Sequence, residues 1–179
     1  MMDIEFYKQI EKSTAHRMSR EINRDFIFKN PDFLNDLIQI AFNIKDKNHH
    51  KAWWILELIF EENLHLITPY LDSFCDIISK LKEDPAKRPA SKICLFLSDS
   101  KKYSLTEKQE TIIIETCLDW LIRDEKVAAK AYSIRTLYNF GKKYDWIHAE
   151  LLQIVQQDYA HHSAAYKAVA KEILRKVKH

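Results

Sequence analysis

A small residue followed three positions later by a large apolar residue recurs along this chain at nearly even intervals. The copies are Ala15–Met18, Ala52–Ile55, Ala90–Ile93, Ala131–Ile134 and Ala170–Ile173. Their alanines are 37, 38, 41 and 39 residues apart. Residues three positions apart lie on the same face of an α-helix, so each copy predicts a helix with one small-then-large stripe. A repeat of about 40 residues is typical of stacked helix pairs.

The glycine content restricts the fold further, because Gly141 is the one glycine among 179 residues. Hairpin turns, glycine-rich phosphate loops and nucleophile elbows all use glycine for positive φ or close backbone approach. Their glycine patterns are therefore excluded, whereas helices joined by polar turns need almost no glycine. Gly141 follows Phe140 and precedes two lysines, which is where the C-terminus of a helix uses this residue.

Capping residues and prolines divide the chain into about ten predicted helices. Asn30-Pro31 and Thr68-Pro69 each predict a helix start, because the first residue can cap the helix and proline fits its first turn. Thr106 and Gln109 have the spacing of a capping box. Together with the apolar periodicity, these signals predict helices near 3–11, 14–28, 31–44, 49–62, 68–81, 85–97, 106–123, 125–140, 145–159 and 163–177.

Cysteine spacing and hydropathy predict the compartment in which the protein resides. Cys75, Cys94 and Cys117 lie in apolar helical stretches without a CxxC pattern, which predicts buried free thiols and a reducing compartment. Charges come too early at the N-terminus for a signal peptide, and the longest apolar run, 52–60, is too short to span a bilayer. We therefore expect a single domain over residues 1–179 that is cytoplasmic and has no membrane segment.

The predicted helix pair resembles the HEAT-like or armadillo-like repeat, a helix–turn–helix unit of about 40 residues. The resemblance covers most of the chain, from about Thr14 to Val177, and is closest over 127–134, the segment VAAKAYSI. Pattern and resemblance together predict an all-α fold, a right-handed α-α superhelix (solenoid) of about five antiparallel helix pairs. A mixed helical bundle is the alternative. The resemblance also implies binding, since HEAT-like domains mostly hold protein partners and some bind nucleic acid.

On a helical wheel, the sides of the second helices that face away from the alanine stripe together carry more basic than acidic residues, with aromatic residues in the second and fourth repeats. We expect these sides to line a concave groove, in which Trp, Tyr and Arg are the usual interface anchors. The alternative for both tryptophans is burial, because their helix is apolar on nearly all sides. The predicted partner-binding residues are Trp53, Trp54 and Tyr132 as anchors, with Arg20, Arg24, Arg88 and Lys92 as a charged rim.

These residues favour a non-catalytic interaction or scaffold module that binds a protein partner in the groove. The alternative is nucleic-acid binding by the same ridge with Lys171 and Arg175, because cationic grooves with aromatic platforms suit phosphates and bases. Tryptophans and glutamates beside arginines also resemble the surface of HEAT-like DNA glycosylases. The sequence leaves the oligomeric state open.

No complete catalytic or metal-binding motif occurs in the sequence. The doublets His49-His50 and His161-His162 place neighbouring side chains about 100° apart on a helix, whereas metal-binding pairs are usually four residues apart. We therefore expect polar turn residues there, and neither a metal site nor a cofactor. Glu57 and Glu61 beside the tryptophans offer a third hypothesis, acid catalysis by a desolvated carboxyl group.

Overall fold

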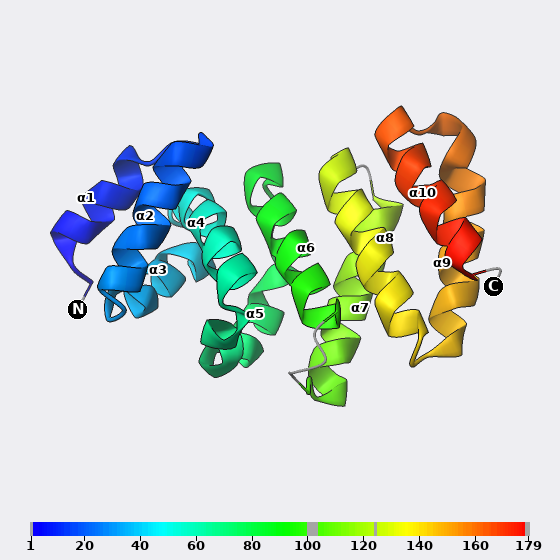
Figure 1. The fold of residues 1–179 in the computed structure, drawn as a ribbon, viewed down its shortest axis with the longest axis horizontal. Helices are drawn as coiled ribbons and strands as arrows, with labels where there is room; N and C mark the ends of the chain where they lie inside the picture. The colour runs from blue at the N-terminus through cyan, green and yellow to red at the C-terminus, as the bar shows by residue number, and fades with distance from the viewer. Residues whose placement is uncertain (1, 100–103, 124, 178–179) are drawn as a thin grey trace. The chain divides into compact units, whose positions relative to one another are not determined.

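The computed structural model describes residues 2–99, 104–123 and 125–177, and these residues form helices and turns without a β-strand (Figure 1). The chain divides into two compact units, Met1–Ile93 and Cys94–His179, with the division inside helix α6. None of the helices in the described ranges has the length and apolar character that crossing a bilayer requires.

The first unit consists of consecutive helices joined by short turns. Helix α4 is its centre, because it packs against α2 and α3 and also contacts α1 and η1. The elements are α1 (Ile4–Lys12), α2 (Arg17–Lys29), α3 (Phe33–Phe42), α4 (His49–Glu62), the 3-10 helix η1 (Leu64–Tyr70), α5 (Leu71–Ile78) and the start of α6 (Asp84–Asp99).

The second unit follows the same plan around α8, which packs against α7, α9 and α10. Its elements, after the end of α6, are α7 (Glu107–Ile122), α8 (Val127–Gly141), α9 (Asp145–Asp158), the 3-10 helix η2 (Tyr159–His161) and α10 (Ala164–Val177). The polar connection predicted between residues 98 and 105 lies partly outside the described residues, because 100–103 are not among them.

The small-then-large stripe lies in the core in three copies of the repeat. Both residues of Ala52–Ile55, Ala90–Ile93 and Ala170–Ile173 are at most 1% exposed. In the fourth copy Ile134 is buried while Ala131 is partly exposed, and the neighbouring Ala129 faces the core instead. The stripe therefore identifies the buried side of these helices.

The prediction of a buried stripe in the first copy of the repeat is wrong. Ala15 precedes α2 and is exposed, and Met18 is 74% exposed. The buried side of α2 is instead formed by Arg20, Asn23 and Ile27. Arg20 reaches Glu57 of α4, whereas Asn23 accepts a hydrogen bond from Gln9 of α1 over 2.9 Å. Helix α2 therefore buries two polar side chains where an apolar stripe was expected.

Trp53 belongs to the core of the first unit and does not line a groove. Its side chain is 0% exposed. Its ring centroid lies 5.4 Å from that of Phe42 on α3 and 5.9 Å from that of Phe74 on α5. Burying a large apolar side chain of this kind stabilises a fold by roughly 1.5–3 kcal/mol, so Trp53 holds three helices together. Of the two interpretations of Trp53, burial is the one that the structure shows.

Two of the predicted helix starts differ from those observed, although the helices themselves are present. Asn30 ends α2, because its N–H donates to the carbonyls of Phe26 and Ile27, and α3 begins only at Phe33. Pro69 lies inside η1, and α5 begins at Leu71. Pro69 is the sixth residue of the seven-residue η1, so here proline lies near the end of a 3-10 helix, two residues before the α-helix begins.

The capping box and the buried cysteines are confirmed. Gln109 N–H donates to the Thr106 hydroxyl over 3.2 Å, and Thr106 N–H donates to the Gln109 side-chain oxygen over 3.0 Å. Two backbone donors at the start of α7 are thereby satisfied. The three cysteines are buried thiols, and none forms a disulfide with another described residue.

Gly141 is required by a close contact and not by its backbone angle. It is the last residue of α8, as the sequence predicted, but it does not adopt the positive φ for which helix C-termini often use glycine. A Cβ atom at this position would lie 1.9 Å from Cδ2 of His148. The His148 ring is held there because its Nε2–H donates to the Tyr138 carbonyl over 3.0 Å and the ring stacks on Tyr138.

We expect Gly141→Ala to destabilise the chain by about 1–3 kcal/mol, because the added methyl group displaces the His148 ring from its hydrogen bond. In a His148→Ala background the same substitution should stabilise the chain by up to about 1 kcal/mol, since alanine favours helix more than glycine does. Urea unfolding of the four proteins measures both effects. The same sign in both backgrounds would refute this account of Gly141.

Candidate functional site

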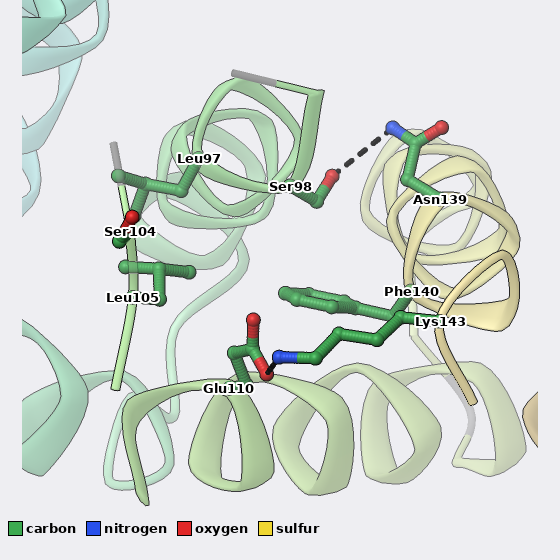
Figure 2. A pocket seen from close by; sticks show the side chains of 8 residues that line it. All are labelled: Leu97, Ser98, Ser104, Leu105, Glu110, Asn139, Phe140 and Lys143. Atoms are coloured by element: carbon green, nitrogen blue, oxygen red, sulfur yellow. Dashed lines mark hydrogen bonds and ion pairs between the residues drawn. The ribbon is translucent and has the colours of Figure 1, made fainter. Parts of the chain in front are cut away.

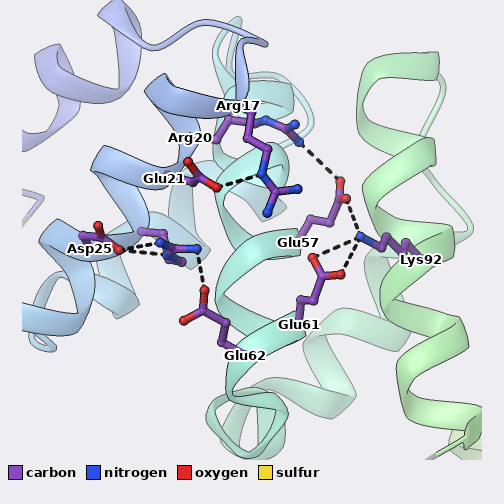
Figure 3. A network of polar contacts seen from close by, with 9 residues as sticks. Arg17, Arg20, Glu21, Asp25, Glu57, Glu61, Glu62 and Lys92 are labelled. Carbon is purple, nitrogen blue, oxygen red and sulfur yellow. Dashed lines mark hydrogen bonds and ion pairs between the residues drawn. The ribbon is translucent and has the colours of Figure 1, made fainter.

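Charged side chains of α2, α4 and α6 gather on one surface of the first unit (Figure 3). Most form ion pairs between helices, and the remainder pair within α2. We call this surface the charged face. Its members are Arg17, Arg20, Glu21, Arg24 and Asp25 of α2, Glu57, Glu61 and Glu62 of α4, and Arg88 and Lys92 of α6.

Glu57 lies at the base of the charged face with a side chain that is 2% exposed. Its carboxylate lies 3.0 Å from Nζ of Lys92, 3.8 Å from a guanidinium nitrogen of Arg20 and 4.0 Å from one of Arg88. A buried carboxylate is costly unless opposite charges compensate it. Three cations from two helices supply that compensation, so Glu57 joins α4 to both neighbours.

Lys92 bridges two carboxylates of α4. Its ammonium donates to Glu57 over 3.0 Å and to both oxygens of Glu61 over 3.0 and 3.1 Å. Burial lowers the pKa of Lys92, but the hydrogen bonds and charges of Glu57 and Glu61 outweigh burial and raise it. Lys92 therefore stays protonated at neutral pH, which argues against a neutral amine nucleophile here.

The predicted rim arginines are present on this surface, but two of them lie deep in it. The side chains of Arg20 and Arg24 are 11% and 15% exposed. Arg24 pairs with Asp25 at 2.8 Å and also with Glu62 of α4. These two arginines position the surface, and the accessible guanidinium groups are those of Arg88 and Arg17, at 46% and 67% exposure.

The charged face is electrically balanced. Its members comprise five basic and five acidic side chains. Glu61 and Glu62 are 40% and 48% exposed, so negative charge reaches the surface beside the arginines. Sequence reasoning found the arginines by their position on the helical wheel. It did not reveal that each would be paired.

Trp54 has a structural partner that the sequence analysis missed. Pro89 lies in the interior of α6 and has no N–H, so the carbonyl of Pro85, four residues earlier, lacks its helical donor. The indole N–H of Trp54 donates to that carbonyl over 2.9 Å. Trp54 is partly exposed, and the edge-on ring of His50 lies 5.0 Å from it. A proline in the interior of a predicted helix is the signal for such an orphan carbonyl four residues earlier.

Tyr132 and the doublet His49-His50 do not belong to the charged face. Tyr132 lies on α8 in the second unit, where it is partly exposed. His49, predicted to be a polar turn residue, is instead the first residue of α4 and is 3% exposed. With His50 and Glu83 it forms the one group in the described part of the chain whose ligand atoms are spaced for a metal ion.

A polar pocket of about 280 Å³ lies in the second unit (Figure 2). Glu110 lies in its wall and accepts hydrogen bonds from Nζ of Lys143 at 2.7 Å and from the Tyr144 hydroxyl at 2.5 Å. The hydrogen bond to Glu110 raises the pKa of Tyr144. On another wall, Asn139 donates to Ser98 over 3.1 Å. These polar groups pair with one another, so they do not present a reactive group to the pocket.

Comparison with protein families shows what this chain is similar to. A family model described as a HEAT repeat domain matches residues 3–177, which includes helices of both units. Neither the curated proteins nor the solved structures that were compared give a significant match.

We expect Glu57→Gln to destabilise the chain by about 3–5 kcal/mol, because it leaves the buried cations around it under-compensated. The matched variant Glu62→Gln, whose side chain is 48% exposed, should cost only about 0–1 kcal/mol. Urea unfolding monitored by circular dichroism measures both. Equal costs would show that Glu57 does not hold the surface together.

A double-mutant cycle tests the Trp54 hydrogen bond. Trp54→Phe should cost about 1–3 kcal/mol of stability, because it leaves the Pro85 carbonyl without a donor. In a Pro89→Ala background the new backbone N–H can reach that carbonyl, so the same substitution should cost less. Thermal or urea unfolding of the four proteins gives the coupling energy. A coupling of zero would contradict the assigned role.

Proposed function

Because this chain belongs to the HEAT repeat family, we propose that it is a non-catalytic interaction or scaffold module that binds a protein partner. HEAT repeats generally mediate protein interactions. Within the first unit, the partner docks on the charged face. The observation that carries this choice is Arg88, an exposed guanidinium that lies beside a buried carboxylate.

Arg88 combines accessibility with a buried opposite charge nearby. Its side chain is 46% exposed, and one guanidinium nitrogen lies 4.0 Å from Glu57. Glu57 is also neutralised by Lys92 and Arg20, so Arg88 keeps N–H donors for a partner. Its planar guanidinium can bind a partner's carboxylate through two parallel hydrogen bonds, and arginine is enriched among the residues that contribute most to interfaces.

The other predicted residues take different roles in this proposal. Trp54 stands on the same side of α4 as Glu57, three residues away, and supplies an aromatic edge to the interface. Arg20, Arg24 and Lys92 hold the surface together from below. Tyr132 is a separate candidate contact in the second unit. Trp53 is buried and has no part in binding.

The charge balance favours a protein over a nucleic acid. A phosphate backbone would meet the exposed carboxylates of Glu61 and Glu62 together with the arginines. A protein segment can carry both signs and so match such a surface. The same balance argues against the glycosylase-like alternative, because its DNA would need a net positive surface.

The test is capture of partners from a lysate by the immobilised chain, followed by affinity measurement with the purified partner. We expect Arg88→Ala to weaken binding of the partner by at least about 2 kcal/mol, as for an interface hot spot. The matched control is Arg123→Ala, since Arg123 is 68% exposed in the second unit and pairs with Asp119. A partner that binds the Arg88 variant as tightly as the native chain would refute the proposed docking surface.

A mobility-shift assay with duplex DNA and with RNA at low salt separates the two binding classes. We expect no complex with either. A complex whose affinity falls steeply with salt would replace the protein partner by a nucleic acid.

A further inference from the structure

The start of α4 and the residue before α6 bring two imidazoles and a carboxylate together in the first unit. Nε2 of His49 lies 3.3 Å from Oε2 of Glu83, and Nδ1 of His50 lies 3.9 Å from the same oxygen. The ligand atoms of the three residues all lie within 4.8 Å of one another. Ligand atoms around one zinc ion lie roughly 3.3 Å apart, given metal–ligand distances near 2.0 Å and tetrahedral angles. Small side-chain movements therefore bring all three to coordinating distance.

The histidines carry buried nitrogens that lack a protein partner. The side chains of His49 and His50 are 4% and 22% exposed. Nδ1 of each is buried and makes no hydrogen bond with any described residue. Buried polar atoms without partners are uncommon in native proteins. Coordination would give Nδ1 of His50 the partner that it lacks.

Neighbouring elements hold this cluster in place. The rings of His49 and His50 are perpendicular, with centroids 5.9 Å apart. Trp54 packs edge-on against His50 and is itself fixed by its hydrogen bond to Pro85. Glu83 is 60% exposed, so an ion can enter from solvent and keep water at its open positions. Adjacent histidines on a helix diverge, and the carboxylate from a second element is what closes the set.

We propose that His49, His50 and Glu83 bind one divalent zinc ion, which links the start of α4 to the start of α6. Two imidazole nitrogens and one carboxylate suit zinc, whereas magnesium and calcium prefer ligand sets made of oxygen. The N-terminal dipoles of α4 and α6 oppose a cation. The affinity is therefore below that of closed four-ligand zinc sites.

The experiment is calorimetric titration of the full chain, stripped with chelator, with zinc chloride. The native chain should bind one zinc ion, and magnesium chloride should give no binding. Glu83→Gln and His50→Gln should each weaken zinc binding at least about 10-fold to 100-fold, since even outer-shell partners of metal ligands contribute this much. His161→Gln, from the exposed histidine of the other doublet, is the matched control and should leave binding unchanged.

Each alternative result would overturn the site. Absence of zinc binding by the native chain would mean that the cluster is only a hydrogen-bonded group. Unchanged affinity in Glu83→Gln, with a native circular dichroism spectrum, or equal loss in His161→Gln, would place the ion elsewhere. None of these measurements involves Arg88 or a protein partner, so their outcome is independent of the proposed interaction.

Discussion

The compensation of one buried negative charge organises the first unit. Glu57 belongs to α4, a helix whose other buried residues are almost all apolar, and its side chain is 2% exposed. A carboxylate in such a place costs several kcal/mol unless cations approach it. Lys92 on α6 and Arg20 on α2 do so, which explains why a charged residue of α2 is buried against α4 where an apolar stripe was expected. The charge of Glu57 therefore joins α4 to both neighbouring helices.

The sequence predicted the helices well because their signals are local. The periodic apolar residues of α4 and the capping box of α7 each depend on positions within one or two turns, and both are confirmed. Local signals did not fix the helix type at Pro69 or the helix start after Asn30, where 3-10 and turn geometry compete with the α-helix. The wheel also gathered Arg20, Arg24, Arg88 and Lys92 correctly on one surface. Their pairing with glutamates of α4 depends on the packing of three helices, which no single-helix pattern contains.

Adjacent residues of the same type have different environments in two places on α4. Trp53 is enclosed between Phe42 and Phe74, whereas Trp54 reaches the carbonyl that Pro89 leaves without a donor. His49 is almost wholly buried, whereas His50 is partly open beside Trp54. A step of about 100° between neighbours on a helix accounts for both divisions. Sequence alone did not separate the two members of either doublet, because it lacked the positions of α3, α5 and α6.

The balance of five cations and five anions on the charged face also has a kinetic consequence. Opposite charges a few ångströms apart cancel at distances beyond a Debye length, so the surface exerts little long-range pull on an approaching molecule. Encounter with a partner would then be governed by unguided diffusion, with an association rate constant of about 10⁵–10⁶ M⁻¹s⁻¹ that changes little with ionic strength. Selectivity would come from how long a complex survives once formed.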